Sequence, residues 1–493
     1  MKRTTAPGFA SALIAATLSL VSVSAAKAQA SLAETYKPTA DKLITASMAD
    51  GEGYANLTYL CDHIGKRVSG SEPLARAIVW AEALMKKEGL ANVRTQAATV
   101  PHWVRGQESG EIIAPVTKPL HMLGLGMSVG TPSAGITAEV VVVPDFAALD
   151  KLGKAGVAGK IVVFNAPYKG YGQTVIYRVN GPTRAEALGA VAVLVRSITP
   201  LAAQLPHTGT TAFEGLPARI PAAAISIEDA LLLERLQAEG APVKVHMQMQ
   251  AHMEAPVVMA NVMGEIVGSE HPEQVVVVGG HIDSWDVGQG AQDDGSGIVA
   301  SLAAVNEIKK LGLHPKRTIR VVFWVNEENG GAGGIAYRKA LSETELLNHV
   351  AAIEMDGGAE APVGYGFGFA GRARQLRPGQ PIMAPQPSLS TGELHSLEML
   401  RDIASLLVPV GANTVKSGGG GSDIEPLMAD GVPALGEMTT GAHYFDWHHT
   451  EADTLDKVDP TDFRKNVASL AVMTYVLADM PERLTGHKGA SEE

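Results

Sequence analysis

The chain has 493 residues, which is too long for one ordinary domain, and its 46% hydrophobic and 19% charged residues give a globular balance with ample core material. Its net charge of −12 disfavours a nucleic-acid partner, because phosphates require a basic face. Cys61 is the only cysteine, so an internal disulfide and a thiol-rich zinc site are both excluded. Any bound metal must therefore be held by His, Asp and Glu side chains.

Residues 1–30 have the pattern of a secretory signal peptide. Lys2 and Arg3 precede a short apolar stretch, which is followed by overlapping A-x-A cleavage patterns ending at Ala28 and Ala30. An uncleaved membrane anchor is the less favoured alternative, because the apolar run is short. Later stretches do not reach the roughly 18–20 apolar residues of a spanning helix. We therefore predict a secreted or periplasmic protein without a membrane span, cleaved near Ala28 or Ala30.

Residues 31–105 are predicted to be mostly helical at first. Apolar residues follow helical spacing from Pro73 to Met85, and Gly89 is a plausible C-terminal stop. A turn at residues 64–71 precedes this helix, and a strand is predicted at Val93–Val100.

Residues 125–255 are predicted to form a small β-rich module with few helices, because short apolar runs are separated by turn residues. Arg178, Arg196 and His207 of this module either face a substrate or, as the favoured interpretation, are solvated surface side chains. The predicted strands are Val140–Val143, Lys160–Phe164, Ala190–Val195, Ala222–Ile225 and Val243–Met247, and the predicted helices are Thr183–Leu188 and Glu228–Ala238.

From about residue 256 strands alternate with helices, which is typical of an α/β domain. Residues 377–388 are rich in proline and predict a surface loop. The predicted strands are Val257–Met263, Gln274–Val278, Thr318–Val325 and Val350–Ile353, and the predicted helices are Ser296–Leu311, Gly334–Leu341, Glu393–Leu407 and Thr461–Met480.

Candidate metal ligands follow three of these strands, and sites in α/β sheets lie beyond the carboxyl ends of the strands. We expect two divalent ions, each with three protein ligands and an open position for water. His281 and Asp356 are predicted to hold one ion. Glu328 and His449 are predicted to hold the other, and Asp293 bridges the two with its two carboxylate oxygens. Nitrogen and oxygen ligands suit Zn²⁺, although Co²⁺ or Mn²⁺ would also serve.

Glu327 is the predicted general base, because adjacent residues point to different sides and Glu327 stays free when Glu328 ligates. Ligating histidines need outer partners that fix their tautomers. Asp283 is predicted to be the outer partner of His281, and Asp453 or Asp423 the outer partner of His449. Each motif alone is more typical of a capped turn or a solvated face, and only their position at successive strand ends favours metal catalysis.

The segments HIDSWDVGQGAQDDGSG, NEENGGAGG, IEMDGG and HHTEADT resemble the signatures of the M28 family of co-catalytic zinc peptidases. The resemblance implies a zinc-dependent exopeptidase fold, with a mixed, mostly parallel sheet and helices on both faces. It implies a protease-associated (PA) domain at 125–255, between an N-terminal part of the peptidase domain at 31–124 and a di-metal peptidase domain at 256–493. It also implies two Zn²⁺ held by the five predicted ligands, hydrolysis of small peptides, chiefly dipeptides, and a homodimer.

The chain departs from that family at the donor that stabilises the tetrahedral oxyanion. Some M28 aminopeptidases have a tyrosine where this chain has Gly419, and others have one where this chain has His448. We predict that His448 is the donor. Two other functions remain open: an aminopeptidase acting on longer peptides, and a non-catalytic binding protein that keeps its metals for structure.

Overall fold

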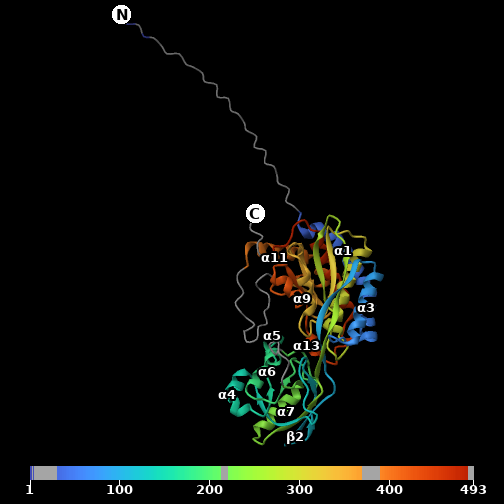
Figure 1. The fold of residues 1–493 in the computed structure, drawn as a ribbon. Helices are drawn as coiled ribbons and strands as arrows, with labels where there is room; N and C mark the ends of the chain where they lie inside the picture. The colour runs from blue at the N-terminus through green and yellow to red at the C-terminus, as the bar shows by residue number, and fades with distance from the viewer. Residues whose placement is uncertain (3, 5–29, 212–219, 369–388, 487–493) are drawn as a thin grey trace.

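The computed structural model describes residues 1, 2, 4, 30–211, 220–368 and 389–486. They form a mixed α/β structure with two eight-stranded sheets, and Figure 1 shows one lobe around each sheet. The predicted signal peptide, apart from a few of its residues, and the predicted loop at 377–388 lie outside the described residues. Among the helices that the structure describes, none is long and apolar enough to cross a membrane.

The first sheet brings the three predicted ligand-bearing strands side by side. Its order is β1–β10–β12–β11–β13–β16–β14–β15, and β11 is parallel to both β12 and β13. The carboxyl ends of these three strands therefore meet at one edge, and the four strands predicted from residue 257 onward are confirmed. The bounds are β1 (Ala91–Val104), β10 (His252–Ile266), β11 (His271–His281), β12 (Arg317–Trp324), β13 (His349–Glu354), β14 (Pro362–Gly368), β15 (Thr414–Ser417) and β16 (Ala434–Thr439).

Helices cover both faces of this sheet, as predicted, because β11 is apolar on both sides. Val276 and Val278 pack into a core with α1 (Leu32–Ala49), α2 (Glu52–Tyr59), α3 (Glu72–Lys87), α8 (Ser296–Lys310), α11 (Thr391–Ser405) and α14 (Pro460–Asp479). Val275 and Val277 pack against α9 (Ala332–Ala340), α10 (Glu343–Leu347) and α12 (Glu425–Ala429). Burying one such side chain contributes about 1.5–3 kcal/mol. The run of valines thus fixes the strand that delivers His281.

The second sheet has the order β3–β2–β9–β5–β6–β7–β8–β4 and begins before residue 125. This lobe contains more helix than expected. The predicted helix at Glu228–Ala238 is confirmed as α7, but α6 is 12 residues long where only Thr183–Leu188 was predicted, and α4 was not predicted. Asp145 caps α4 by accepting a hydrogen bond from the Ala148 N–H (2.8 Å), but glycines within α4 obscured its helical pattern. The bounds are β2 (Glu108–Ala114), β3 (Lys118–Pro119), β4 (Met122–Gly124), β5 (Ile136–Val143), α4 (Phe146–Val157), β6 (Ile161–Phe164), α5 (Tyr171–Thr174), α6 (Ile176–Ala187), β7 (Ala192–Arg196), β8 (Ala222–Ile225), α7 (Ile227–Ala238) and β9 (Lys244–Met249).

The second lobe lies against the edge of the first sheet where the ligand-bearing strands end. Figure 1 shows α13 (Tyr444–Trp447) of the first lobe close to α5 of the second. The rings of Tyr171 and Phe445 are stacked with centroids 5.0 Å apart. Trp285 packs edge-on against Trp103, and a Cβ atom on Gly126 would overlap its ring. The junction is thus a closely packed contact.

Candidate metal centre

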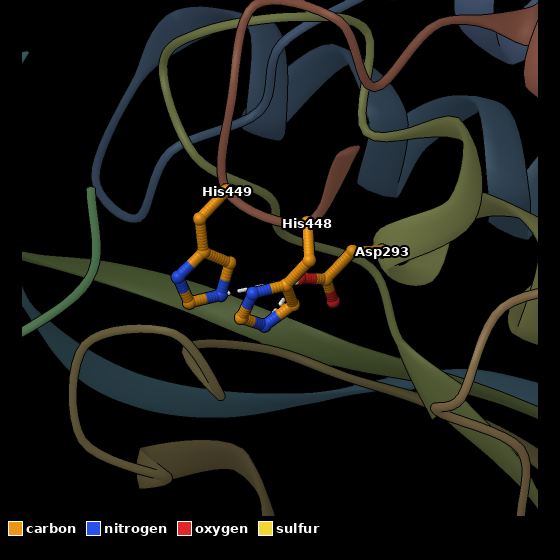
Figure 2. A group of neighbouring side chains, drawn as sticks. All are labelled: Asp293, His448 and His449. Atoms are coloured by element: carbon orange, nitrogen blue, oxygen red, sulfur yellow. Dashed lines mark ion pairs between the residues drawn. The ribbon is translucent and has the colours of Figure 1, made fainter. Parts of the chain in front are cut away.

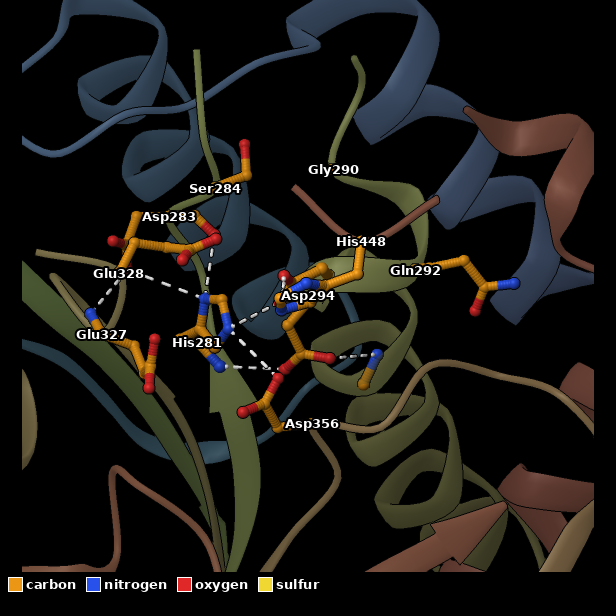
Figure 3. Close-up of polar contacts among 12 residues, drawn as sticks. His281, Asp283, Ser284, Gly290, Gln292, Asp294, Glu327, Glu328, Asp356 and His448 are labelled. Carbon is orange, nitrogen blue, oxygen red and sulfur yellow. Dashed lines mark hydrogen bonds and ion pairs between the residues drawn. The ribbon is translucent and has the colours of Figure 1, made fainter. Parts of the chain in front are cut away.

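The five predicted ligands come together at the edge of the first sheet. His281 ends β11, while Glu328 and Asp356 follow the ends of β12 and β13. Asp293 comes from the turn before α8, and His449 from the segment after α13. Figure 3 shows the His281 ring and the Asp356 carboxylate facing each other. Their role as metal ligands stays a prediction that this geometry supports.

Asp293 occupies the middle of the group. Its Oδ1 lies 3.2 Å from His281 Nε2, and its Oδ2 lies 3.2 Å from His449 Nε2. On the far side of His281, Asp356 Oδ1 lies 3.3 Å from the same Nε2. On the far side of His449, Glu328 Oε2 lies 3.1 Å from Nε2. The two oxygens of Asp293 therefore face two separate pairs of side chains, as a bridging carboxylate requires.

The donor set fits divalent cations. His281 Nε2, Asp293 Oδ2 and Glu328 Oε1 are buried and have no hydrogen-bond partner among the described residues. A buried polar atom without a partner costs free energy, so such atoms mark a site that a ligand completes. Nitrogen and carboxylate oxygen are the donors that Zn²⁺ accepts.

The pKa shifts within the group are also consistent with a cation site. Burial raises the pKa of Glu328 to about 8 and that of Asp356 to about 6. Burial alone would lower the pKa of His281, but the neighbouring carboxylates of Asp356 and Asp293 raise it well above its usual value. These directions follow from the packing of carboxylates and imidazoles together in a buried site. Metal ligands must be deprotonated, so bound cations would favour the charged carboxylates and the neutral imidazoles.

The carboxylates of Asp453 and Asp294 hold the turn that carries Asp293, a role that the sequence analysis did not predict for either residue. Asp453 Oδ1 accepts hydrogen bonds from the N–H groups of Ala291 (3.1 Å) and Gln292 (2.7 Å), and its Oδ2 accepts one from Asp293 (3.2 Å). Asp294 accepts from the backbone N–H of His281 (3.0 Å). The peptide bond between Asp293 and Asp294 is cis. These contacts fix Asp293 relative to β11.

The shortest contact of the outer nitrogen of each histidine is to a backbone carbonyl. His281 Nδ1 lies 3.0 Å from the Asp283 carbonyl oxygen, so Asp283 serves His281 as predicted but through its backbone. His449 Nδ1 lies 3.2 Å from the Thr208 carbonyl oxygen, in the second lobe. The prediction that Asp453 or Asp423 serves His449 was wrong. Asp453 instead holds the turn of Asp293, and Asp423 is buried near Glu354.

Glu327 and Glu328 face different surroundings, as the sequence suggested. Glu328 is buried in the group and Glu327 is half-buried. The Asp283 carboxylate accepts a hydrogen bond from the Glu327 N–H (3.1 Å), which fixes the backbone at this pair. Asn326 adopts a left-handed conformation (φ 70°), which Asn tolerates, and it turns the chain sharply after β12. The Glu327 carboxylate is close enough to Asp356 to contribute to raising its pKa.

Two further polar side chains lie beside Asp293 and His449. Tyr444 is on α13, and His448 follows the end of that helix. The rings of His448 and His449 are stacked with centroids 3.5 Å apart, and His448 Nε2 lies 3.5 Å from Asp293 Oδ2 (Figure 2). Tyr444 was not predicted. Its ring packs 5.1 Å from that of His448, and burial, then the nearby carboxylates of Asp293 and Asp356, raise its pKa well above the usual value.

The three polar residues singled out in the second lobe have different positions. Arg178 is buried beside His449, and its guanidinium donates to the Thr208 carbonyl (3.1 Å) and to the Tyr171 hydroxyl (2.8 Å). His207 is buried next to Thr208. The surface interpretation was therefore wrong for Arg178 and His207. Arg196 is half-buried and donates to Asn165 (3.1 Å).

A small cavity of about 170 Å³, which includes its open mouth, lies beside Asp293, Glu328 and His449. It is smaller than the roughly 300–1,000 Å³ of pockets that hold drug-sized ligands. Its wall combines metal-type and apolar side chains: Trp285, Val287, Gly290, Asp293, Glu328, His449, Thr450 and Asp453.

Comparisons with known proteins identify the family. The model of peptidase family M28 matches residues 261–474. Carboxypeptidase Q of Xenopus laevis is 39% identical over 452 residues, which cover 91% of each chain. The crystal structure of a peptidase M28 precursor from Shewanella amazonensis is 32% identical with a TM-score of 0.83, covering 92% of this chain and 99% of that one. A zinc aminopeptidase from Bacillus subtilis shares the fold, with a TM-score of 0.63 at 18% identity, covering 89% and 98%.

The identity to carboxypeptidase Q extends along nearly the whole chain, and the family model spans every residue of the metal-type group. The resemblance seen in the sequence motifs is thereby confirmed, and so is the mixed α/β fold that it implied. The chain belongs to peptidase family M28 and is a metallo-exopeptidase.

Proposed function

We propose that the protein is a secreted or periplasmic two-zinc exopeptidase that hydrolyses short peptides, chiefly dipeptides with free ends. The observation that carries the proposal is the position of Asp293, whose two oxygens face His281 and His449 at 3.2 Å each. A single carboxylate between two histidines creates two adjacent cation positions. Co-catalytic hydrolases use such pairs of positions.

His281, Asp293 and Asp356 would hold one Zn²⁺, and Asp293, Glu328 and His449 would hold the other. When bound, such a pair of cations lowers the pKa of a water molecule toward about 7 and polarises the carbonyl that the water attacks. The chain contributes the geometry, because the outer contacts of both histidines and of Asp293 are made by buried groups. Co²⁺ or Mn²⁺ would fit the same donors.

Glu327 is the proposed general base. Its carboxylate is half-buried beside the group and forms no ion pair among the described residues, so it is free to accept a proton from the attacking water. The same carboxylic acid then donates that proton to the amine that leaves when the peptide bond breaks. The backbone bond from Glu327 N–H to Asp283 keeps this side chain in place.

The name carboxypeptidase Q of the relatives agrees with release from a free carboxyl end. An aminopeptidase that acts on longer peptides is the second candidate, because zinc aminopeptidases share the fold. The two functions differ in which peptide end must be free.

The experiment that tests the proposal joins a metal analysis with a substrate panel. We expect about two equivalents of zinc per mature chain and hydrolysis of unblocked dipeptides that a chelator abolishes. The hydrolysis of dipeptides blocked at the amino or the carboxyl end, and of longer peptides, shows which end of the substrate must be free. A chain that carries the metals but cleaves no peptide in the panel would contradict the exopeptidase function.

His448 is the proposed oxyanion donor, which gives a further prediction. Replacing His448 with Phe should lower turnover at least about tenfold, because one donor to the developing charge is lost. Zinc content should not change, since His449 rather than His448 is the proposed ligand. Zinc content is measured alongside steady-state kinetics. Near-normal turnover in His448→Phe together with a large loss in Tyr444→Phe would assign the role to Tyr444 instead.

Three proposals about the organisation of the protein rest on the family resemblance. The second lobe, predicted at 125–255, is proposed to be a PA domain inserted between an N-terminal part at 31–124 and the metal-binding part at 256–493. The sheet of this lobe also includes β2, which begins at Glu108. The chain is also proposed to form a homodimer and to lose residues 1–30 on export.

A further inference from the structure

The second lobe contributes a direct contact to one proposed metal ligand. The Thr208 N–H donates to the His449 carbonyl (3.0 Å), and His449 Nδ1 lies 3.2 Å from the Thr208 carbonyl oxygen. Thr208 is fully buried and lies between β7 and β8, 241 residues away along the chain. A histidine that ligates through Nε2 keeps its hydrogen on Nδ1, so the Thr208 carbonyl is the outer partner that fixes its tautomer and ring orientation.

His449 needs such a contact because its backbone is strained. Its φ of 63° is in the left-handed region, which a non-glycine residue occupies only at a cost in free energy. Such a conformation persists when the surroundings hold it. The two bonds to Thr208 hold both the backbone and the ring of His449.

Thr208 is itself held by Arg105, which follows the end of β1. The Thr208 hydroxyl donates to the Gly124 carbonyl (2.7 Å), and Arg105 Nη2 donates to the same hydroxyl oxygen (3.4 Å). Arg105 Nη1 also donates to the Gly124 carbonyl. Thr208 and Arg105 therefore share one carbonyl acceptor at the start of the second lobe.

Arg105 also holds the loop that joins His281 to Asp293. Its Nε and Nη2 donate to the two carboxylate oxygens of Asp286 at 2.8 and 2.6 Å. The guanidinium is buried, and the Trp103 ring lies 4.9 Å from it. A paired, two-point contact of this kind fixes orientation as well as distance, which an ammonium group does not.

We propose that Arg105 is a positioning residue for the metal centre. By binding Asp286 on one side and Thr208 on the other, it fixes the second lobe relative to the ligand loop and thereby orients His449. The proposal rests on the proposed function, because it takes His449 to be a ligand of the Glu328 cation position. His281 and Asp356 make no contact with Thr208, so their position depends on these contacts only through the loop that Arg105 holds.

The test measures metal affinity without any catalytic readout. Metal-free protein is titrated with Zn²⁺ against a chromophoric chelator. Arg105→Met should weaken the zinc equivalent at the His449 position by about 10–100-fold, as losses of outer contacts do, and should weaken the other equivalent less. Arg105→Lys should lie between Arg105→Met and the wild type, because it keeps a charge but not the two-point contact.

Two further variants and a control define the outcome. Thr208→Val keeps the backbone contacts and removes only the hydroxyl, so it should weaken the same equivalent even if Arg105→Met folds poorly. The effects of Arg105→Met and Asp286→Asn on zinc affinity should be non-additive in the double variant. Arg184→Met is the matched control, since Arg184 pairs with Asp150 (2.9 Å) on the surface of the same lobe and should bind zinc like the wild type.

Two results separate the possible failures. A wild-type chain that binds no second equivalent overturns the proposed function and, with it, this inference. A wild-type chain that binds two equivalents, while Arg105→Met and Thr208→Val bind both with unchanged affinity or weaken both equally, overturns the inference alone.

Discussion

Replacing Glu327 with Gln should lower kcat by about 10²–10⁴-fold while zinc content stays at the wild-type level. Gln has the size of Glu but does not accept a proton at neutral pH. The backbone contact from residue 327 to Asp283 does not involve the side chain and is retained. Since Glu328 rather than Glu327 faces the histidines, metal binding should not change. Steady-state kinetics on an unblocked dipeptide and metal analysis of the same preparation measure both quantities.

This variant also separates the enzyme from a binding protein that keeps its metals for structure. Glu343→Gln is a matched control, because Glu343 is exposed and pairs with Arg338 (3.2 Å) on the surface. It should behave like the wild type. Equal activities of Glu327→Gln and the wild type would exclude Glu327 as the general base, whereas loss of zinc from Glu327→Gln would show that it is a ligand.

Replacing Asp293 with Asn should remove both zinc equivalents and lower turnover by more than about 10³-fold. An amide has one carbonyl oxygen and no charge, so it cannot bridge two cations as a carboxylate does. The lowered pKa of a cation-bound water would be lost together with the metals. Metal analysis, a peptide assay and a thermal melt on one preparation check the result.

Glu328→Gln is the informative comparison for Asp293→Asn. Glu328 Oε2 lies 3.1 Å from His449 Nε2, whereas Asp356 is the carboxylate beside His281, so the loss of Glu328 should weaken the His449 position more than the His281 and Asp356 position. Asp150→Asn changes the same functional group at an exposed position and should have no effect. If Asp293→Asn kept both equivalents, Asp293 would not be a bridge, and the two-metal arrangement would need another central ligand.

The sequence by itself determined the sheet and the identity of the clustered side chains. A run of four valines is apolar on both sides, so Val275–Val278 had to be a strand buried under helices on two faces. Parallel neighbours end at one edge, which placed the residues after β11, β12 and β13 together. Family motifs then identified the M28 fold, and the comparisons confirmed it.

Only the tertiary structure decided how these side chains are held. Asp453 reaches the turn of Asp293 across 160 residues, and Thr208 reaches His449 across 241. Both contacts use backbone groups, which every residue possesses, so no pattern of side chains along the chain marks them. The sequence therefore indicates which groups can bind a metal, whereas the packing of the second lobe against the first decides which backbone atoms orient them.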